Sequence, residues 1–474
     1  MAKSRYSSYI SSKTLWQNEI PSHWQETELR MLFADNKNKN LGLVERNLLS
    51  LSYGKIKRKD IDNATGLVPA SFEGYQIIDK GFIVLRFTDL QNDKKSLRVG
   101  YVEEKGIITS AYIGLAPKAG IHSKYFYYQL HFLDKIKYFY NLGGGVRQSL
   151  AFKEFGRETV LIPPKEEQTA IARFLDYKLA KINRFIQKKK QLIKLLNEQK
   201  AAIINQAVTK GLDPNTKMKD SGIEWLGEIP EHWQKHKIKY LISKSIAGAW
   251  GTEPQNDDND ITCVRVADFN EYDIKTDNLT IRNIEAKTEQ ILKPGDLLLE
   301  KSGGGEKTPV GRVVLFNQSF KSVTSNFISK FSPKIDLVSS EYLLYIFKLI
   351  NSVRWNFRSL KQTTGIQNID TYQYMDNWVF IPKIEEQTTI VNHIKNEFKV
   401  LDETISKIEK EIALVEEYKT ALIAEAVTGK IDVRGYEVPE ITEEETYDDP
   451  DSYREEEEIS MAAEDEEAYQ NIIE

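Results

Sequence analysis

The sequence feature that most constrains the fold is an internal repeat with an offset of 219 residues. The segment 162–213 begins Ile-Pro-Pro-Lys-Glu-Glu-Gln-Thr and ends Ala-Val-Thr-Lys-Gly-Leu-Asp. The segment 381–432 begins Ile-Pro-Lys-Ile-Glu-Glu-Gln-Thr and ends Ala-Val-Thr-Gly-Lys-Ile-Asp, and no gap separates the two registers. A repeat of this length indicates that the chain carries one architectural unit twice.

Each copy has the periodicity of a long helix. Apolar residues recur every three or four positions from Ile171 to Ala207 and again from Ile390 to Ala426. Such a stripe, sustained over several heptads, predicts a coiled coil between the two copies, although each helix could instead pack only on its own domain. Lys200 and Lys419 interrupt both stripes at the same position, and polar interruptions of this kind can fix helix register. Lys189 interrupts the first stripe only.

A second repeated motif precedes each half. Residues 16–25 read Trp-Gln-Asn-Glu-Ile-Pro-Ser-His-Trp-Gln, and residues 225–234 read Trp-Leu-Gly-Glu-Ile-Pro-Glu-His-Trp-Gln. We call these the opening motifs. Each half is therefore an opening motif, a body of one domain's size and a long helix.

Short apolar runs cut by Gly, Asn and Asp predict strands in both bodies. The expected strands are 48–53, 75–78, 82–87, 106–115, 261–266, 296–300, 311–316 and 378–381, and the expected short helices are 124–140 and 341–350. The predicted fold class is α+β. The predicted division is body 1 at 1–160, helix 1 at 161–210, a linker at 211–224, body 2 at 225–380, helix 2 at 381–432 and an acidic tail at 433–474.

Charge is distributed unevenly along the chain. The formal net charge is −5, but residues 440–474 alone carry sixteen acidic residues and one arginine, so residues 1–439 have a net charge of about +10. The tail is expected to be solvated and largely unstructured. A mildly basic body is compatible with nucleic acid binding. A single cysteine, Cys263, and the lack of a long apolar run predict a cytoplasmic protein that does not span a membrane.

The sequence contains no recognisable catalytic motif. The run Gly303–Thr308 lacks the glycine that precedes the lysine of a phosphate-binding loop. His232 and His236 have the spacing of two metal ligands, but no third ligand follows them. Cys263 lies in an apolar run and is expected in a core. We therefore predict a protein without enzymatic activity, metal or cofactor of its own.

Candidate DNA contacts occur in both bodies. Lys55, Lys57, Arg58 and Lys59 could contact phosphates or could simply form a solvated loop. Arg147 and Gln148 follow three glycines, which allow close backbone approach, and both side chains can pair with base edges. Gln367 and Asn368 occupy the matching place in the second half, although these polar residues could also close the turn onto their own body. Lys301, Lys307 and Arg312 are weaker candidates.

These elements in this order resemble the DNA specificity subunit of type I restriction-modification enzymes. The resemblance rests on Ile-Pro-x-His-Trp, Gly-x-Arg-Gln-Ser-Leu, Pro-Pro-x-Glu-Glu-Gln and the helix endings, and it covers about residues 15–435. Two departures are Gly365-Ile366-Gln367-Asn368 in place of the arginine turn, and the acidic tail.

The resemblance implies that each body is a target recognition domain that reads one half of a split double-stranded DNA sequence. It implies that the two helices form an antiparallel coiled coil with pseudo-twofold symmetry. It also implies partners: two methyltransferase subunits that modify adenine and restriction subunits that translocate and cleave DNA, with S-adenosylmethionine, ATP and Mg²⁺ bound by these partners. Such systems belong to bacteria and archaea.

Three other functions can be compared with the sequence pattern. An enzyme fused into one chain is disfavoured because catalytic motifs are absent and because too little of the chain remains outside the two bodies and their helices for a further catalytic domain. A coiled-coil assembly protein that does not touch DNA is weakly disfavoured by the basic body and the Gly-rich arginine turn. The specificity subunit of a related methyltransferase–nuclease complex outside type I also remains open.

Overall fold

The computed structural model describes residues 5–62, 69, 71–88, 90, 97–142, 149–304, 310–363 and 366–439. Within these ranges, none of the helices is long and apolar enough to cross a membrane. The described chain divides into two compact units. Unit 1 comprises the residues up to Lys189 together with those from Glu409 onward, and unit 2 comprises Lys190–Ile408.

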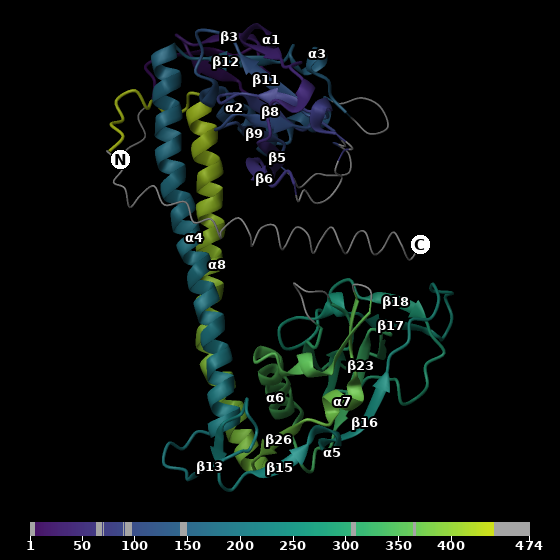
Figure 1. The fold of residues 1–474 in the computed structure, drawn as a ribbon. Helices are drawn as coiled ribbons and strands as arrows, with labels where there is room; N and C mark the ends of the chain where they lie inside the picture. The colour runs from purple at the N-terminus through teal and green to yellow at the C-terminus, as the bar shows by residue number, and fades with distance from the viewer. Residues whose placement is uncertain are drawn as a thin grey trace. The chain divides into compact units, whose positions relative to one another are not determined.

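Two long helices are the largest elements, and both were predicted. Helix α4 spans Lys165–Lys210 and helix α8 spans Ile384–Val427, with 46 and 44 residues (Figure 1). Helix α4 starts directly after Pro164, and α8 starts two residues after Pro382. Both carry two glutamates in the first turn, where the helix dipole favours negative charge. The apolar stripe of each helix is buried near its two ends and only partly buried in its middle.

The helices pair in antiparallel orientation. In unit 1, Ile171 near the start of α4 shares a core with Ala426 near the end of α8. In unit 2, Ala207 near the end of α4 shares a core with Ile390 near the start of α8. Positions 171 and 390 are equivalent in the repeat, as are 207 and 426, so the pairing follows the pseudo-twofold relation of the sequence. We call the paired helices the rod.

The lysines that interrupt the stripe reach polar partners on the opposite helix. Lys189 Nζ lies 2.7 Å from Glu411 Oε2, and Lys419 Nζ donates to Asn183 Oδ1 at 2.8 Å. Each of these pairs lies inside unit 1. Because a lysine in another register would face an apolar side chain, these pairs favour the observed alignment of the helices.

The body of unit 1 is layered. Leu49 and Ile78 of one four-stranded sheet pack against Val84 of a second sheet, while Ile83 and Leu85 face helix α2 on the other side. From one edge to the other, the strands of the first sheet are β6 (Lys55–Lys59), β5 (Leu48–Ser52), β10 (Gly106–Ile108) and β7 (Gln76–Ile78). Those of the second sheet are β4 (Phe33–Asp35), β11 (Ile113–Pro117), β8 (Ile83–Leu85) and β9 (Val99–Tyr101). The remaining elements are β1 (Tyr9–Ser11), β2 (Glu19–Pro21), β3 (Gln25–Glu28), β12 (Thr159–Ile162), α1 (Leu29–Leu32), α2 (Ser123–Lys135) and α3 (Phe152–Phe155).

The body of unit 2 repeats this layering. Leu297 and Leu299 face helix α6, while Leu298 between them faces a second core with Val264 and Ile328. The sheets are β16 (Ile242–Ala247), β23 (Ile328–Pro333), β19 (Asp296–Glu300), β21 (Val313–Phe316); β18 (Thr280–Asn283), β17 (Asp260–Val264), β22 (Ser322–Thr324); and β20 (Ser302–Gly304), β25 (Ile366–Ile369), β24 (Leu360–Thr363). The remaining elements are β13 (Met218–Asp220), β14 (Glu228–Pro230), β15 (Gln234–Lys237), β26 (Trp378–Ile381), α5 (Ile238–Leu241), α6 (Ser340–Ser352) and α7 (Thr371–Met375).

Most predicted elements are present, with three differences. The run 106–115 is two strands, β10 and β11, which belong to different sheets. The helix expected at 124–140 ends at Lys135, because Lys137 has a left-handed φ of 59°. The linker 211–224 contains strand β13, which pairs with β14 of the opening motif just as β1 pairs with β2.

The packed chain of unit 1 extends past residue 432, where the sequence analysis began the acidic tail. Val433 is 4% exposed, and the Tyr436 ring packs edge-on against Phe174 of α4, with ring centres 4.8 Å apart. Residues 440–474, which hold the acidic clusters, lie outside the described residues.

A glycine with a φ of +71° follows each long helix, Gly211 directly after α4 and Gly429 two residues after α8, but their surroundings differ. A Cβ on Gly429 would lie 2.4 Å from Pro21 Cδ, whereas a Cβ on Gly211 would have no neighbour closer than 3.5 Å.

We expect Gly211→Ala to lower the free energy of unfolding by about 1 kcal/mol through the left-handed backbone alone. Gly429→Ala should cost about 1–3 kcal/mol more, because Pro21 must move. Chemical denaturation of both variants checks this, and equal losses would contradict the close approach.

Candidate nucleic-acid interface and its supporting junctions

The basic cluster of body 1 is an edge strand rather than a loop. Lys55, Lys57, Arg58 and Lys59 lie on β6, which pairs with β5 through a two-residue turn at Tyr53-Gly54. Both turn residues have positive φ, as the tight hairpin turn requires. Lysines on an edge strand also deter pairing with other sheets. The placement is therefore compatible with phosphate contact and with edge protection.

An exposed apolar tip lies directly before this hairpin, and the sequence analysis missed it. The tip consists of Leu41, Leu43 and Val44, which are 69%, 50% and 74% exposed. The loop is held by buried Asn40, whose side chain donates to Glu45 O at 2.9 Å and accepts from Glu45 N at 3.0 Å. A loop that is fixed in place yet displays three aliphatic side chains is typical of a contact surface.

The Gly-rich turn with Arg147 and Gln148 lies outside the described residues. The chain resumes at Ser149 and Leu150, and Leu150 N donates to Phe87 O at 3.1 Å. Ser149 and Leu150 line an open cavity of about 630 Å³ together with Asn36, Gln76 and Tyr112. The two residues that follow the turn thus lie at an open cavity of body 1 that is lined by both polar and apolar side chains.

In body 2 the structure brings three predicted residues together at the sheet β20-β25-β24. Asn368 pairs with Ser302, whose hydroxyl donates to Asn368 Oδ1 at 2.5 Å, and Lys301 directly precedes that serine. Burial lowers the pKa of Lys301. Gln367 is 7% exposed, and its amide oxygen has no hydrogen-bond partner within the described chain.

Two other candidates of body 2 do not join this group. Lys307 lies outside the described residues. The Arg312 guanidinium is paired with Glu300, with 2.9 Å between Nε and Oε2. A buried ion-pair partner makes Arg312 part of the internal structure of its sheet, although its side chain remains half exposed.

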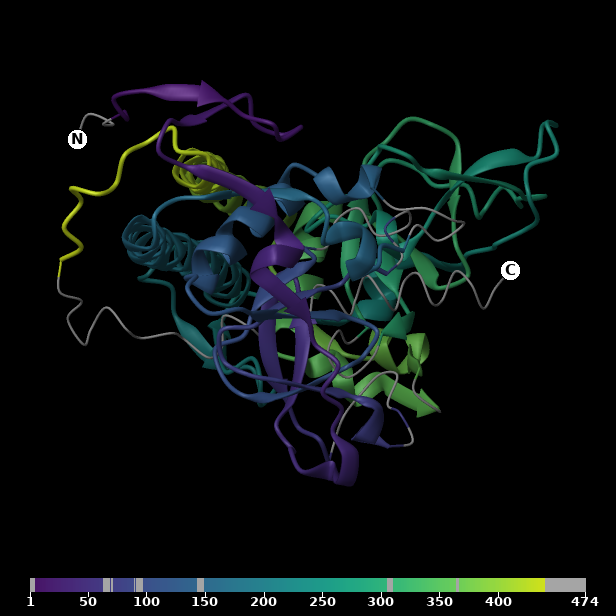
Figure 2. The ribbon, with the colours of Figure 1, turned by 90° about the horizontal axis from the view of Figure 1, so that it is seen from above.

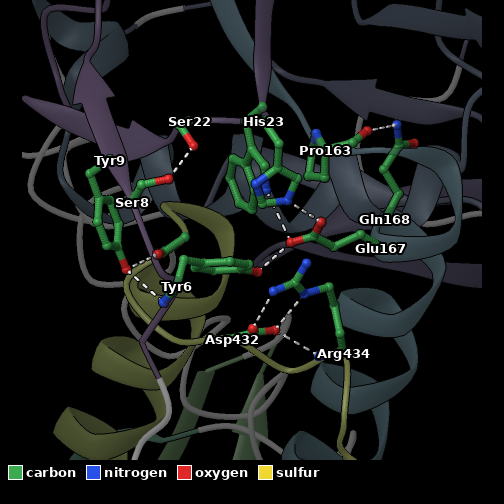
Figure 3. Close-up of polar contacts among 12 residues, drawn as sticks. Tyr6, Ser8, Tyr9, Ser22, His23, Pro163, Glu167, Gln168, Asp432 and Arg434 are labelled. Atoms are coloured by element: carbon green, nitrogen blue, oxygen red, sulfur yellow. Dashed lines mark hydrogen bonds and ion pairs between the residues drawn. The ribbon is translucent and has the colours of Figure 1, made fainter.

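A junction around a buried carboxylate joins the first opening motif to the rod (Figure 3). Glu167, in the first turn of α4, has a side chain that is 3% exposed. Its carboxylate accepts from Trp24 Nε1 at 3.0 Å, from His23 Nε2 at 2.8 Å and from the Tyr6 hydroxyl. Burial and the bond to Glu167 raise the pKa of Tyr6. The His-Trp pair of the opening motif therefore serves to hold the start of the long helix.

Unit 2 contains the same junction. Glu386, in the first turn of α8, accepts from Trp233 Nε1 at 3.0 Å and from His232 Nε2 at 2.8 Å. His232 thus helps to hold the start of α8, as His23 does for α4. Among the described residues, no group of three or more His, Cys, Asp or Glu is arranged to hold a metal ion.

The glutamine after each of these glutamates ties the rod to its body. Gln168 Oε1 accepts from the backbone N of His122, the residue that caps α2, at 2.9 Å, and its Nε2 donates to Pro163 O at 2.9 Å. Gln387 makes the equivalent contact with Ser339 N, which caps α6, at 2.9 Å. The repeated Glu-Glu-Gln motif is thus explained: its last two side chains bind the opening motif and the body helix.

In unit 1 the two ends of the described chain meet at this junction. The Tyr9 hydroxyl donates to Gly429 O at 3.0 Å, so the N-terminal strands run beside the end of α8 (Figure 2). Arg434 pairs with Asp432 through two nitrogens, and its guanidinium lies 5.0 Å from the centre of the Tyr6 ring. This pairing holds the pKa of the Asp432 carboxyl below its ordinary value. In unit 2 there are no chain ends at the corresponding place, because the chain continues from Gly211 through the linker into β13 and β14.

The lone cysteine was correctly placed in a core. Cys263 is fully buried in β17, and burial raises the pKa of its thiol to about 11. A thiol with a raised pKa is a poor nucleophile at neutral pH, which agrees with the structural role predicted for it.

Comparison with known proteins identifies the family. The family model described as "Type I restriction modification DNA specificity domain" matches residues 56–195 and 230–414, which together are more than half of the chain. The chain belongs to this family. The first match covers body 1 from β6 onward and the second covers nearly all of body 2, each with part of the long helix that follows, so the specificity domain is matched twice.

Individual relatives agree with this assignment. The specificity subunit of the type I restriction enzyme EcoBI of Escherichia coli is 22% identical over 286 residues, covering 58% of this chain and 59% of that protein. The StySPI specificity subunit of Salmonella potsdam is 23% identical over 274 residues, covering 57% of each. The matches thus span less than three fifths of the length of these relatives. A solved chain described under "complex assembly and conformational transition of the type I R-M system" superposes with a TM-score of 0.54 at 14% identity, covering 87% of this chain and 99% of that one, which shows a shared fold.

The paired specificity domains offer a matched test of the junctions. Glu167→Gln removes a charged acceptor from three donors in a site that is 3% exposed, whereas Glu386→Gln affects two donors in a site that is 34% exposed. We expect Glu167→Gln to lower the free energy of unfolding by about 1–3 kcal/mol and Glu386→Gln by less. Urea denaturation of the full chain measures both. A larger loss for Glu386→Gln would refute the ranking by burial and donor number.

Proposed function

We propose that this chain is the specificity subunit of a type I restriction-modification system. In this role it binds a bipartite double-stranded DNA sequence, with each body reading one half and an unread spacer between the halves. The observation that carries the proposal is the duplicated specificity domain, each copy joined to one end of an antiparallel helix pair by the same Glu-Gln junction.

The length of the rod helices supports a role in spacing. A helix of 46 residues is roughly 69 Å long at ~1.5 Å per residue. Successive major-groove sites on one side of DNA are about 34–36 Å apart. A helix pair of this length is therefore sufficient to carry two readers across a spacer of one or more helical turns. A twofold protein also suits a duplex whose strands run antiparallel.

We assign the DNA contacts of body 1 to three features. Lys55, Lys57, Arg58 and Lys59 on the edge strand would contact phosphates. The apolar tip at Leu41, Leu43 and Val44 is suited to thymine methyl groups or to a wedge between base steps. Arg147 and Gln148 would read base edges. In body 2 we assign Asn368, Lys301, Lys307 and, after rearrangement of its buried side chain, Gln367.

The chain would act as a scaffold without catalysis of its own. Two methyltransferase subunits would bind it and methylate adenine on each strand, and restriction subunits would join them. S-adenosylmethionine, ATP and Mg²⁺ would be bound by these partners. The methylated adenine would have to leave the base stack to reach a partner's pocket.

The scaffold role predicts a reconstitution result. The purified chain alone should not methylate DNA, and adding its methyltransferase subunits should produce adenine methylation at one bipartite sequence. Methylation-aware sequencing of DNA treated with each mixture reads out both the sequence and the spacer. Methylation by the isolated chain would overturn the scaffold role, and methylation without sequence preference would overturn the specificity role.

Phosphate and base contacts should be distinguishable by substitution. Lys57→Gln and Arg58→Gln should each weaken DNA binding about equally for all sequences. Each should also reduce the slope of the logarithm of the binding constant against the logarithm of the salt concentration by about one. Arg147→Ala should cost about 1–3 kcal/mol for the recognised sequence only. Fluorescence titration at several salt concentrations checks both, with Lys188→Gln on the exposed face of α4 as a control of equal charge change. An unchanged affinity in Arg147→Ala would return that residue to a structural role.

A further inference from the structure

A buried lysine in unit 2 connects the rod to the second body. Lys200 lies on α4 at an interrupted position of the apolar stripe, and its side chain is 3% exposed. Its Nζ lies 3.0 Å from Asp402 Oδ1 on α8 and 2.9 Å from Glu271 Oε2, which belongs to a loop of the body between Asp268 and Thr280. One ammonium group therefore bridges both helices and the body.

Aromatic rings enclose this ammonium group. Lys200 Nζ lies 5.0 Å from the ring centre of Tyr272 in the body loop and 4.9 Å from that of Phe398 on α8. The two rings are 5.5 Å apart, and the loop is tied back to its body by Leu315 N, which donates to Tyr272 O at 2.8 Å. A cation between two rings and two carboxylates has a defined position, since its attractions come from several directions.

The equivalent lysine of unit 1 has a different partner. Positions 200 and 419 are 219 residues apart, and so are 183 and 402. Lys419 accordingly contacts Asn183, at 2.8 Å, where Lys200 contacts Asp402. The contact between the helices is thus kept in both units, but in unit 1 it is made to a neutral amide.

The body helices show the same difference in charge. Lys348 and His131 are each the ninth residue of α6 and α2. Lys348 donates to the backbone O of Glu271 and lies 4.9 Å from the Tyr272 ring centre, and burial lowers its pKa to about 8. Burial, with Lys135 and Lys419 nearby, lowers the pKa of His131 to about 3, so the ring is neutral at physiological pH. The contact between the second body and the rod is therefore a network of two cations, Lys200 and Lys348, and two carboxylates, those of Glu271 and Asp402.

A buried ionic network of this kind specifies geometry more than it adds stability. Replacing buried ion pairs by apolar groups of similar volume is often neutral or stabilising, because the charges no longer have to be desolvated. A polar residue in a helical core nevertheless selects one arrangement over others, since only one satisfies it. A methionine at position 200 would fit the aromatic surroundings but would accept several placements of the loop.

We propose that Lys200 is a positioning residue: by joining Glu271 to Asp402 it fixes the second body on the rod in the orientation that reads its half of the DNA site. This inference rests on the proposed function. It implies that the second body is held by charge at a defined angle and that the accepted spacer length depends on this contact.

The test measures spacer preference in the complete complex of the full chain with its methyltransferase subunits. Duplexes carry the recognised sequence with its natural spacer, or with a spacer one base pair shorter or longer. The readout is the ratio of methylation rates on natural and altered spacers. We expect Lys200→Met to reduce this ratio by roughly fivefold, within the range of coupling between residues of one network. A loss of stability alone would lower all rates together and leave the ratio unchanged.

Three matched variants make the result decisive. Glu271→Gln breaks the contact on the body side at a half-exposed residue, so it should fold normally and should lower the ratio like Lys200→Met. Asp402→Asn reproduces the natural Lys-Asn pair of unit 1, and Lys419→Met removes the lysine of that pair. In both variants the ratio of methylation rates should stay within about twofold of the wild-type ratio, because Lys200 still contacts Glu271.

The failures can be told apart. If the wild-type complex shows no bipartite specificity, the proposed function fails and this inference fails with it. If wild type is specific and Glu271→Gln keeps its spacer ratio, only the positioning role of Lys200 is overturned. An equal effect of Lys419→Met would also overturn it, since that would make spacer preference a general property of the helix pair.

Discussion

The antiparallel pairing of α4 and α8 is the constraint on which the rest of the structure depends. Each helix buries its apolar stripe mainly near its two ends, and the start of each one shares a core with the end of the other. Neither sequence repeat is therefore a self-contained folding unit. Each compact unit combines one body, the start of the helix that follows it and the end of the other repeat's helix. This explains why the compact units divide both helices, whereas the sequence repeat keeps each helix whole.

The second requirement is that each body keeps a defined attachment to this helix pair. A glutamate and a glutamine in the first turn of each long helix provide this attachment. The helix N-terminus favours the negative charge of the glutamate, and the adjacent glutamine can cap the body helix. The glutamate collects indole and imidazole donors from the opening motif, and the glutamine accepts the amide of the residue before α2 or α6. In unit 1 this junction also gathers the two ends of the described chain. The same motif thus connects three separate stretches of sequence at one point.

The two halves differ where the proposed function requires difference. Their helices, junctions and layering are repeated, while the surfaces that could meet DNA are not. Body 1 presents a basic edge hairpin and an apolar tip, and body 2 presents a sheet with Asn368 and a buried Gln367. The interrupting lysines differ as well: Lys200 pairs with the carboxylates of Asp402 and Glu271, whereas Lys419 donates to the amide oxygen of Asn183. A scaffold that repeats while its reading surfaces diverge is what a bipartite, asymmetric DNA sequence would require.

The sequence by itself determined the repeat, the two long helices, most strands and the family, because these depend on periodicity and on motifs that local residue order encodes. It also placed Cys263 in a core and located the interrupting lysines. Only the tertiary structure decided that residues 106–115 form two strands of different sheets, that the His-Trp pairs bind Glu167 and Glu386, and that Lys200 reaches Glu271 while Lys419 reaches Asn183. These outcomes depend on contacts between residues that lie up to 236 positions apart, and no local pattern records which of several polar partners a folded chain will bring within hydrogen-bond distance.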